Sequence, residues 1–296
     1  MKINLVSLFT CAAIAVLSLP ILSAYAENNG TEQPIFSHDG EGGGFLKIGA
    51  GYLNKSTPYG DKNTGYETFF SARYQFENGL YGEFSNGANE INSGRSIGYN
   101  FLNTEKWNFD LSIMQGHGAS TIAYIFESNE QITSESSKNK IKLELGETYM
   151  LGLRATGKFD DTLVQFIAAP YSFNNDYDDA YYASAWLSEE WQLRNWQLHS
   201  SVGVTYRSAG MINHYYNLNV RVDSEPALPK LDDSLNVTAQ IGASYSFAEN
   251  WLFESYYRYT KLSDSIIDSP VIQLKDPVSG SVDHESEFAL SVSYVF

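Results

Sequence analysis

The stretch SLNVTAQIGASYSF, residues 234–247, alternates apolar and polar side chains over its whole length. Its apolar series consists of Leu235, Val237, Ala239, Ile241, Ala243, Tyr245 and Phe247. A period of two is the pattern of a β-strand. Strands of soluble sheets are usually about 5–6 residues long, whereas a tilted strand that crosses a bilayer needs about 9–11. The segment is therefore long enough to cross a membrane as a strand.

The same pattern recurs in TGYETFFSARYQF (64–76), WQLHSSVGVTYR (196–207) and FALSVSYVF (288–296). Phe69 is an exception, because it falls among the polar residues of its segment. A soluble β-sandwich also alternates, so strand length alone leaves both folds open.

The connections between these segments are of two kinds, which alternate along the chain. The tight ones are 77–79, 103–106, 157–161, 193–195 and 248–250. The long polar ones are 54–64, 86–94, 117–147, 172–179, 208–233 and 263–283. Short periplasmic turns and long external loops are typical of outer-membrane barrels. The sequence therefore predicts an all-β, transmembrane antiparallel β-barrel of 12 strands over residues 45–296, with both termini periplasmic.

One further segment, HYYNLNVRV (214–222), also resembles a strand. Counting it would make the strand number odd, whereas bacterial single-chain barrels have even numbers. We therefore assign it to the external loop 208–233, as an extension of a strand above the membrane.

The N-terminal residues 1–26 are predicted to be a cleaved signal peptide. Lys2 precedes an apolar stretch, and Ala24-Tyr25-Ala26 forms a small-residue cleavage site. An uncleaved membrane anchor is the alternative. Cys11, the single cysteine, lies inside this segment, and the bulky residues before it argue against a lipid anchor. The polar, glycine-rich residues 27–44 are predicted to be a flexible periplasmic leader.

The chain is acidic, with 35 Asp and Glu against 19 Lys and Arg and a net charge of −16 at pH 7. Nucleic acid is an unfavourable partner for such a chain, because its phosphates require a basic face. After residue 26 no apolar run is long enough for a transmembrane helix. The predicted location is the outer membrane of a Gram-negative bacterium, in contact with lipid and lipopolysaccharide.

Charged residues recur on the face of the strands that is predicted to point inward. They are Lys47, Glu67, Arg73, Glu83, Asp110, Arg154, Glu254, Arg258, Glu285 and Glu287. Eight strands leave a filled interior and sixteen an open channel, so twelve leave limited room. Charges of both signs are expected to pair across a constricted lumen. A small pore that prefers cations is the alternative.

Three short turns are each followed by a tryptophan and then by alternation, in KWNFDLSI, NWQLHSSV and NWLFESYY. Trp107, Trp196 and Trp251 are therefore predicted to form a periplasmic aromatic girdle. Core tryptophans of a soluble fold are the alternative. At the end of the chain, alternate apolar residues before a final aromatic resemble the signal that outer-membrane assembly machinery recognises. These residues are Phe288, Leu290, Val292, Tyr294 and Phe296.

No common catalytic or metal-binding motif is present, so neither enzymatic activity nor a cofactor is expected. His199 and Ser201 share the inward face and could serve as base and nucleophile, but a polar lumen often contains such residues, which favours a structural role. The acidic stretch 174–182, with Asp176, Asp178 and Asp179, offers oxygen ligands for Ca²⁺. It lacks the glycine and distal glutamate of a calcium loop, which favours a solvated loop without a metal.

The later half of the chain resembles the MltA-interacting protein (MipA)/OmpV family of outer-membrane proteins. The most specific segment is RYTKLSDSIIDSPVI (258–272). Asn213–Tyr216 resembles the tyrosine-rich loop of that family, although Asn217 stands where a glycine is expected. Weaker counterparts are 97–102 and 57–60.

This resemblance implies a non-enzymatic barrel that acts as a scaffold in cell-wall biogenesis. Its partners would be a murein lytic transglycosylase and a penicillin-binding protein that synthesises murein. Pro34-Ile35-Phe36 in the leader is the candidate docking element for them. A small porin or osmotic-response channel is one alternative. A surface adhesin that uses loops 117–147 and 208–233 is another.

Overall fold

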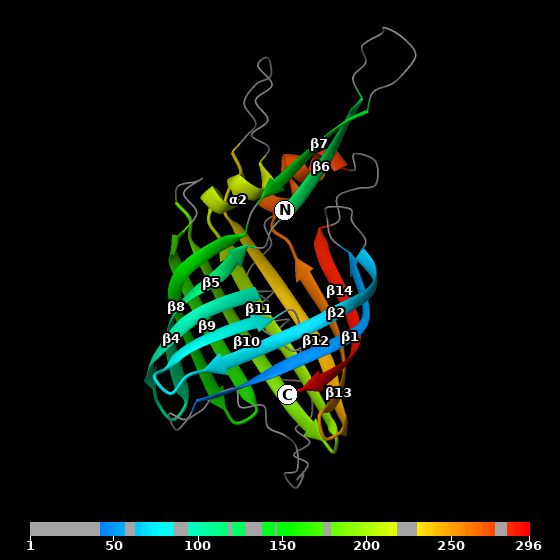
Figure 1. Ribbon diagram of the computed structural model, residues 1–296. Coiled ribbons are helices and arrows are strands. Elements are labelled where there is room, and N and C mark those ends of the chain that lie inside the picture. The colour runs from blue at the N-terminus through cyan, green and yellow to red at the C-terminus, as the bar shows by residue number, and fades with distance from the viewer. Residues whose placement is uncertain are drawn as a thin grey trace, which may run out of the picture.

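A computed structural model of the chain describes residues 42–56, 63–85, 94–117, 120–127, 138–145, 147–173, 179–217, 230–275 and 283–296. Within these residues, twelve antiparallel strands form a closed barrel (Figure 1). The strands are β1 (Gly43–Ser56), β2 (Asn63–Gln75), β3 (Leu80–Ser85), β4 (Gly94–Asn103), β5 (Trp107–His117), β8 (Thr148–Phe159), β9 (Thr162–Ser172), β10 (Tyr182–Leu193), β11 (Trp196–Arg207), β12 (Ser234–Ala248), β13 (Trp251–Lys261) and β14 (His284–Val295). The predicted twelve-stranded barrel is confirmed.

The first and last strands close the barrel. β1 pairs with β14 from Lys47 opposite Val295 to Ser56 opposite Ser286. The amide of Phe296 also donates to the carbonyl oxygen of Leu46 at 2.8 Å. A closed sheet leaves no unpaired edge, which is the condition for a sheet that spans a bilayer.

The alternation along β12 separates a membrane barrel from a soluble sandwich. Its buried residues are the polar ones, including Asn236, Thr238 and Gln240, whereas Leu235 and Ile241 are 42% and 62% exposed. A soluble sandwich would bury the apolar series instead. The apolar face therefore forms the outer surface and the polar face lines the interior, as in a transmembrane barrel.

Phe69, which breaks the alternation of β2, points into this interior. It is buried in a small apolar cluster with Tyr256 and Ala289, and Leu53 packs against the cluster. The lumen is thus not uniformly polar, and the exception in the sequence corresponds to an apolar patch on the inner wall.

The tight connections gather at one end of the barrel and the long ones at the other (Figure 1). Three residues of the tight turns have a positive φ, namely Gly79, Asp160 and Arg194. The assignment of the short-turn end to the periplasm remains a prediction. Residues 1–41, which include the predicted signal peptide, most of the leader and Pro34-Ile35-Phe36, lie outside the described residues.

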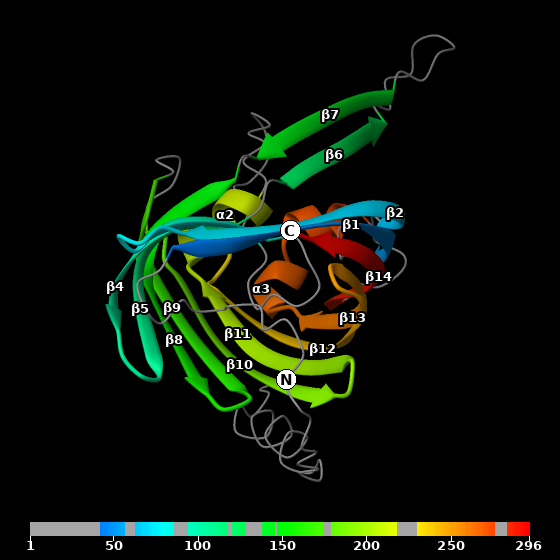
Figure 2. The same cartoon turned by 60° about the horizontal axis from the view of Figure 1, so that its bottom comes forward.

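The long connections contain secondary structure of their own. β6 (Ser120–Glu127) and β7 (Lys138–Leu145) pair as a hairpin that projects from the barrel (Figures 1 and 2). Three helices follow: α2 (Ala209–Tyr216), α3 (Asp264–Ile267) and α4 (Pro270–Lys275). In the part of the chain that the structure describes, no helix has the length and apolar character needed to span a membrane.

The predicted strand extension over 214–222 is wrong for its first residues, which belong to α2. The helix begins before that segment and buries Met211, Ile212, Tyr215 and Tyr216. These buried residues are one, three and four positions apart, which is the spacing of one face of a helix. The helical pattern therefore prevails over the alternation of a strand in this segment. Residues 218–229 lie outside the described residues.

Candidate functional site: charged lumen networks and a helical cap

One network of charges lines the inner wall from β2 to β8 and centres on Arg154. Its Nε donates to Asp110 Oδ2 at 2.9 Å, and its Nη1 donates to Glu83. Arg73 Nη1 lies 3.5 Å from Glu83 Oε2. The two arginines and two acids, which stand on four of the five strands from β2 to β8, therefore neutralise one another, which is how buried charges are tolerated.

Neighbouring polar groups complete this network. Ser96 Oγ donates to Glu83 at 2.6 Å, and Asn100 Nδ2 donates to Asp110 at 2.8 Å. The buried ring of Tyr81 lies between two guanidinium groups, with centroid distances of 5.2 Å to Arg73 and 5.1 Å to Arg154. Such cation–π contacts hold the arginine planes against the wall.

A second network lies on the wall formed by β1, β14, β13, β12 and β11. Lys47 Nζ donates to Glu254 Oε1 at 2.9 Å, and both side chains are almost fully buried. Ser293 Oγ donates to the other carboxylate oxygen of Glu254 at 3.3 Å. This ion pair spans β14, the strand that closes the barrel.

Arg258 extends the second network along the same wall. Its Nε donates to Gln240 Oε1 at 2.7 Å, and its Nη1 lies 3.9 Å from Glu287. Gln240 Nε2 in turn lies 3.4 Å from His199 Nε2. One ring nitrogen of His199, Nε2, thus faces the side-chain amide of Gln240. This geometry favours the structural role for His199.

The remaining predicted charges lie higher on the same walls. Lys55 Nζ is 3.3 Å from Glu287, and Tyr256 donates its hydroxyl to Glu287. Glu285 is half-buried on β14, and Glu67 is exposed on β2. The structure therefore groups most of the predicted lumen charges into two networks and leaves Glu67 at their margin.

The three predicted girdle tryptophans each begin a strand at the short-turn end. Trp107 packs against Phe159, Trp196 lies 4.8 Å from Tyr245, and Trp251 lies 5.2 Å from Tyr294, measured between ring centroids. Aromatic rings in such pairs are suited to a membrane interface. Their role as a girdle remains a prediction.

The predicted assembly residues share the outer face of β14. Phe288, Val292 and Phe296 are exposed by 38%, 40% and 68%. Leu290 and Tyr294 are half-buried on the same face. These side chains are therefore accessible from outside the barrel. Their recognition by assembly machinery remains a prediction.

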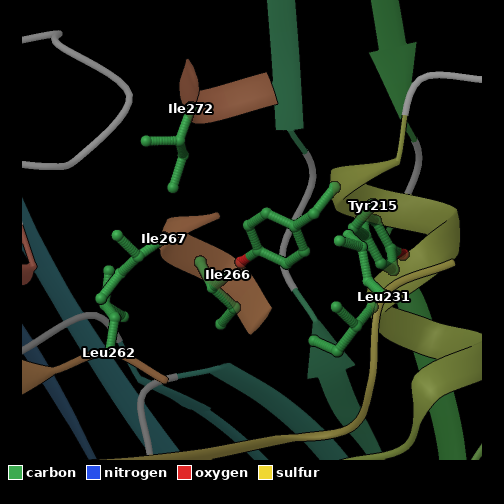
Figure 3. Packing of buried hydrophobic residues seen from close by; sticks show 8 residues of the cluster. Tyr215, Leu231, Leu262, Ile266, Ile267 and Ile272 are labelled. Carbon is green, nitrogen blue, oxygen red and sulfur yellow. The ribbon is translucent and has the colours of Figure 1, made fainter. Parts of the chain in front are cut away.

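Above the lumen, the long connections form a compact helical cap, which the sequence did not predict. Figure 2 shows α2 and α3 within the ring of strands, and Figure 3 shows side chains of the helices packed together. The buried cluster consists of Ile212, Tyr215, Tyr216, Leu231, Leu262, Ile266, Ile267 and Ile272. The two segments that resemble the MipA/OmpV family, 213–216 and 258–272, thus meet in this cap.

The cap is fastened to the barrel at the rim of β5 and β8. The ring of His117 stacks on Tyr215 with centroids 3.7 Å apart, and its Nε2 lies 3.2 Å from the Tyr216 hydroxyl. Thr148 Oγ1 is hydrogen-bonded to the Tyr215 hydroxyl. Met211 of α2 is buried and joins an apolar cluster on the inner wall that includes Met114.

Asn213 ties α2 to the chain that enters β12. Its Nδ2 donates to the carbonyl oxygens of Ala209 at 2.7 Å and Leu231 at 2.6 Å. Its Oδ1 accepts from the Leu231 amide at 2.9 Å. One side chain therefore satisfies both backbone groups of Leu231 inside the cap.

The described residues contain no cluster of three or more His, Cys, Asp or Glu side chains that could hold a metal ion. Of the predicted acidic loop, Asp179 is described, whereas Asp176 and Asp178 lie outside the described residues. At the rim, hydrogen bonds from Lys261 and His284 lower the pKa of Asp283 to about 2.

A closed antiparallel sheet with an apolar outer surface and an ion-paired polar interior defines a transmembrane β-barrel of the outer-membrane class. The family model described as MltA-interacting protein MipA matches residues 48–296. The chain therefore belongs to the MltA-interacting protein MipA family.

Two relatives and two solved structures are similar to the chain. MltA-interacting protein from Escherichia coli (strain K12) and from Shigella flexneri are each 30% identical over 73 residues, covering 24% of this chain and 29% of the relative. The aligned part is thus less than a third of those relatives. The NanC porin is 11% identical, with 84% of this chain and 98% of the porin covered and a TM-score of 0.46. Outer-membrane expressed OmpT of Vibrio cholerae is 8% identical, with 86% and 97% covered and a TM-score of 0.44.

Proposed function

We propose that this protein is a non-enzymatic outer-membrane barrel that serves as a docking scaffold for murein enzymes in the periplasm. In this role the protein links a lytic transglycosylase to a penicillin-binding protein that synthesises murein. The family membership supports this proposal, because related proteins are named for an interaction with MltA.

The cap is the observation that favours a scaffold over an open pore. Eight buried side chains pack as a core within the mouth of the barrel. Protein cores are packed to the density of organic crystals, so solutes do not pass through them. The ion pairs of Arg154 and Lys47 further join strands across the inner wall. A lumen narrowed by the cap and by these ion pairs would suit a protein whose barrel is an anchor.

In this proposal the chain is exported with cleavage after residue 26, and both termini and the short turns face the periplasm. The part of the leader before β1, residues 27–42, then lies at the short-turn end, with Pro34-Ile35-Phe36 as the docking element. The tight turns offer little surface, so the leader is the segment best suited to reach a soluble enzyme.

Co-purification after mild crosslinking of cell envelopes tests the scaffold. We expect the intact barrel to recover a lytic transglycosylase and a variant without 27–42, the part of the leader before β1, to lose it. A variant without the projecting hairpin 120–145 is the matched control and should retain the partner. Equal recovery without 27–42 removes the leader from the proposal. No recovery with the intact protein contradicts the scaffold itself.

A small gated pore is the second candidate. Small polar side chains on the inner wall, such as Ser112, Ser184 and Ser188, favour it, since they would suit a wetted lumen. Planar-bilayer recording separates the two candidates. A scaffold predicts no steady conductance from the refolded protein, whereas reproducible single-channel steps would establish the pore.

A further inference from the structure

An apolar groove of about 680 Å³ crosses the outer face of β1–β4. Its upper side follows one row of the sheet register, in which Arg95 lies opposite Phe84, Phe84 opposite Ala72, and Ala72 opposite Leu46. Phe296 ends this row, where its backbone N–H donates a hydrogen bond to the Leu46 carbonyl oxygen. The groove therefore runs from the short-turn end at Phe296 to the long-loop end at Arg95.

The neighbouring row forms the other side of the groove. There Ile97 lies opposite Gly82, Gly82 opposite Tyr74, and Tyr74 opposite Gly44. Ile97 and Tyr74 are 69% and 51% exposed. A Cβ atom placed on Gly82 would meet no heavy atom within 4 Å. The glycine thus leaves open space between two large side chains, and a larger residue there would fill the groove without displacing the wall.

A cation stands at the long-loop end of the groove. The guanidinium of Arg95 lies 5.3 Å from the ring centroid of Phe84, and its side chain is 54% exposed. Its Nη1 contact with Glu147 Oε2 is long, at 3.4 Å. A guanidinium has five N–H donors in a fork that matches phosphate oxygens. Arg95 can therefore bind an anion while it keeps the contact with Glu147.

We propose that this groove binds an acyl chain of lipopolysaccharide, with a phosphate of that lipid at Arg95. The groove is open on the outer face of the barrel, and its lining is almost wholly apolar, so the acyl chains that surround it in the bilayer can lie along it. The choice of lipopolysaccharide rests on the proposed orientation, which places the long-loop end outside. A second copy of the chain fits the groove less well, because it would press an apolar surface against Arg95.

Native mass spectrometry of the full-length processed protein, extracted from outer membranes in mild detergent, tests the proposal. We expect the wild type to retain one lipopolysaccharide molecule and Gly82→Leu to retain none. Arg95→Gln should lower retention about tenfold, because it removes charge-assisted hydrogen bonds to phosphate.

Matched controls separate the groove from general effects on the surface. Ala50→Leu enlarges an exposed outer residue of β1 that does not line the groove. Lys106→Gln removes an exposed cation that lies 5.6 Å from the ring of Phe159 at the short-turn end. Both controls should retain the lipid as the wild type does. Heat-modifiable gel mobility verifies that every variant is folded.

Equal retention by Gly82→Leu and wild type would overturn the proposal. Retention of phospholipid alone, or a lipid-free dimer that Gly82→Leu dissociates, would also overturn it. Protease digestion of the 120–145 hairpin on intact cells reports the orientation independently, and recovery of the transglycosylase reports the scaffold. A failed lipid site and a failed scaffold are therefore distinguishable.

Discussion

At the scale of single residues, the barrel depends on charges that are buried in pairs. Lys47 and Glu254 lie on β1 and β13 and are almost fully removed from solvent. Taking a charge out of water is costly, and the partner charge offsets much of that cost. The net contribution of this ion pair to stability is therefore smaller than the loss of stability expected when one partner is removed.

Replacing Lys47 with Met is expected to lower the free energy of unfolding by about 3–5 kcal/mol, because Glu254 is left buried without its cation. The double variant Lys47→Met with Glu254→Gln should recover most of this loss. Urea unfolding in lipid vesicles measures both. Lys55→Met is the control, since Lys55 is 39% exposed beside Glu287, and it should cost under about 1 kcal/mol. Equal losses for Lys47→Met and Lys55→Met would contradict the prediction.

At the rim, Asp283 is expected to respond to pH in one direction. Lys261 and His284 donate to its carboxylate and lower its pKa from 3.8 to about 2. Because this pKa is lower in the folded state than in the unfolded chain, the ionised carboxylate stabilises the folded state at pH values above the unfolded pKa. This contribution is lost as the pH falls from about 4 towards 2. Titration of the carboxyl carbon by NMR measures it. Lys261→Met should move the midpoint upwards, and an unchanged midpoint would exclude the contact.

At the scale of elements, α2 holds its place through tertiary contacts. A helix of eight residues is too short to be stable alone in water. Its residues Met211 and Ile212 are fully buried against the rest of the protein, and its residue Asn213 is hydrogen-bonded to Leu231. The cap is thus a small second core, and it should be able to loosen while the barrel remains intact.

Asn213→Ala is expected to loosen the cap by about 1–3 kcal/mol, because the backbone groups of Leu231 lose their partner. Hydrogen exchange should rise in 209–216 and 230–233 and stay unchanged in the barrel strands. Asn250→Ala removes an exposed bond of 3.0 Å to Tyr294 at the other end and serves as the control. Uniform exchange changes over the barrel would show that the cap is not a separate unit.

At the scale of the whole molecule, the barrel closes where the first strand, β1, pairs with the last strand, β14. Phe296 donates its amide to Leu46, and its ring lies 4.7 Å from Tyr294. Most of its side chain remains exposed, so it adds little to the folded barrel. Its position instead favours a role before folding is complete.

Deletion of Phe296 is therefore expected to lower the assembled fraction in cells far more than the stability of protein that has already folded. Pulse-chase labelling with heat-modifiable mobility measures assembly, and urea unfolding in vesicles measures stability. Phe296→Tyr keeps a final aromatic and should assemble normally. Equal losses of assembly and stability on deletion would contradict an assembly signal.

Much of the barrel follows from local pattern. Strands predicted at 196–207 and 64–76 are observed as Trp196–Arg207 and Asn63–Gln75. A period of two and the breakers between strands are local properties of the chain, so they can be recognised without a structure. The hairpin at 120–145 and the helix at 209–216 were not predicted from the sequence. They lie within connections that were recognised by their polarity and length alone.

The sequence by itself determined that this protein is a closed barrel with an apolar outer face, because alternation, strand length and turn spacing are all encoded within about ten residues. Only the tertiary structure decided that Arg154 pairs with Asp110 and Glu83, that the segments around Tyr215 and Ile266 meet in a cap, and that Gly82 opens a groove. These features join residues far apart in the chain. Their geometry depends on strand register and strand tilt, which no local pattern specifies.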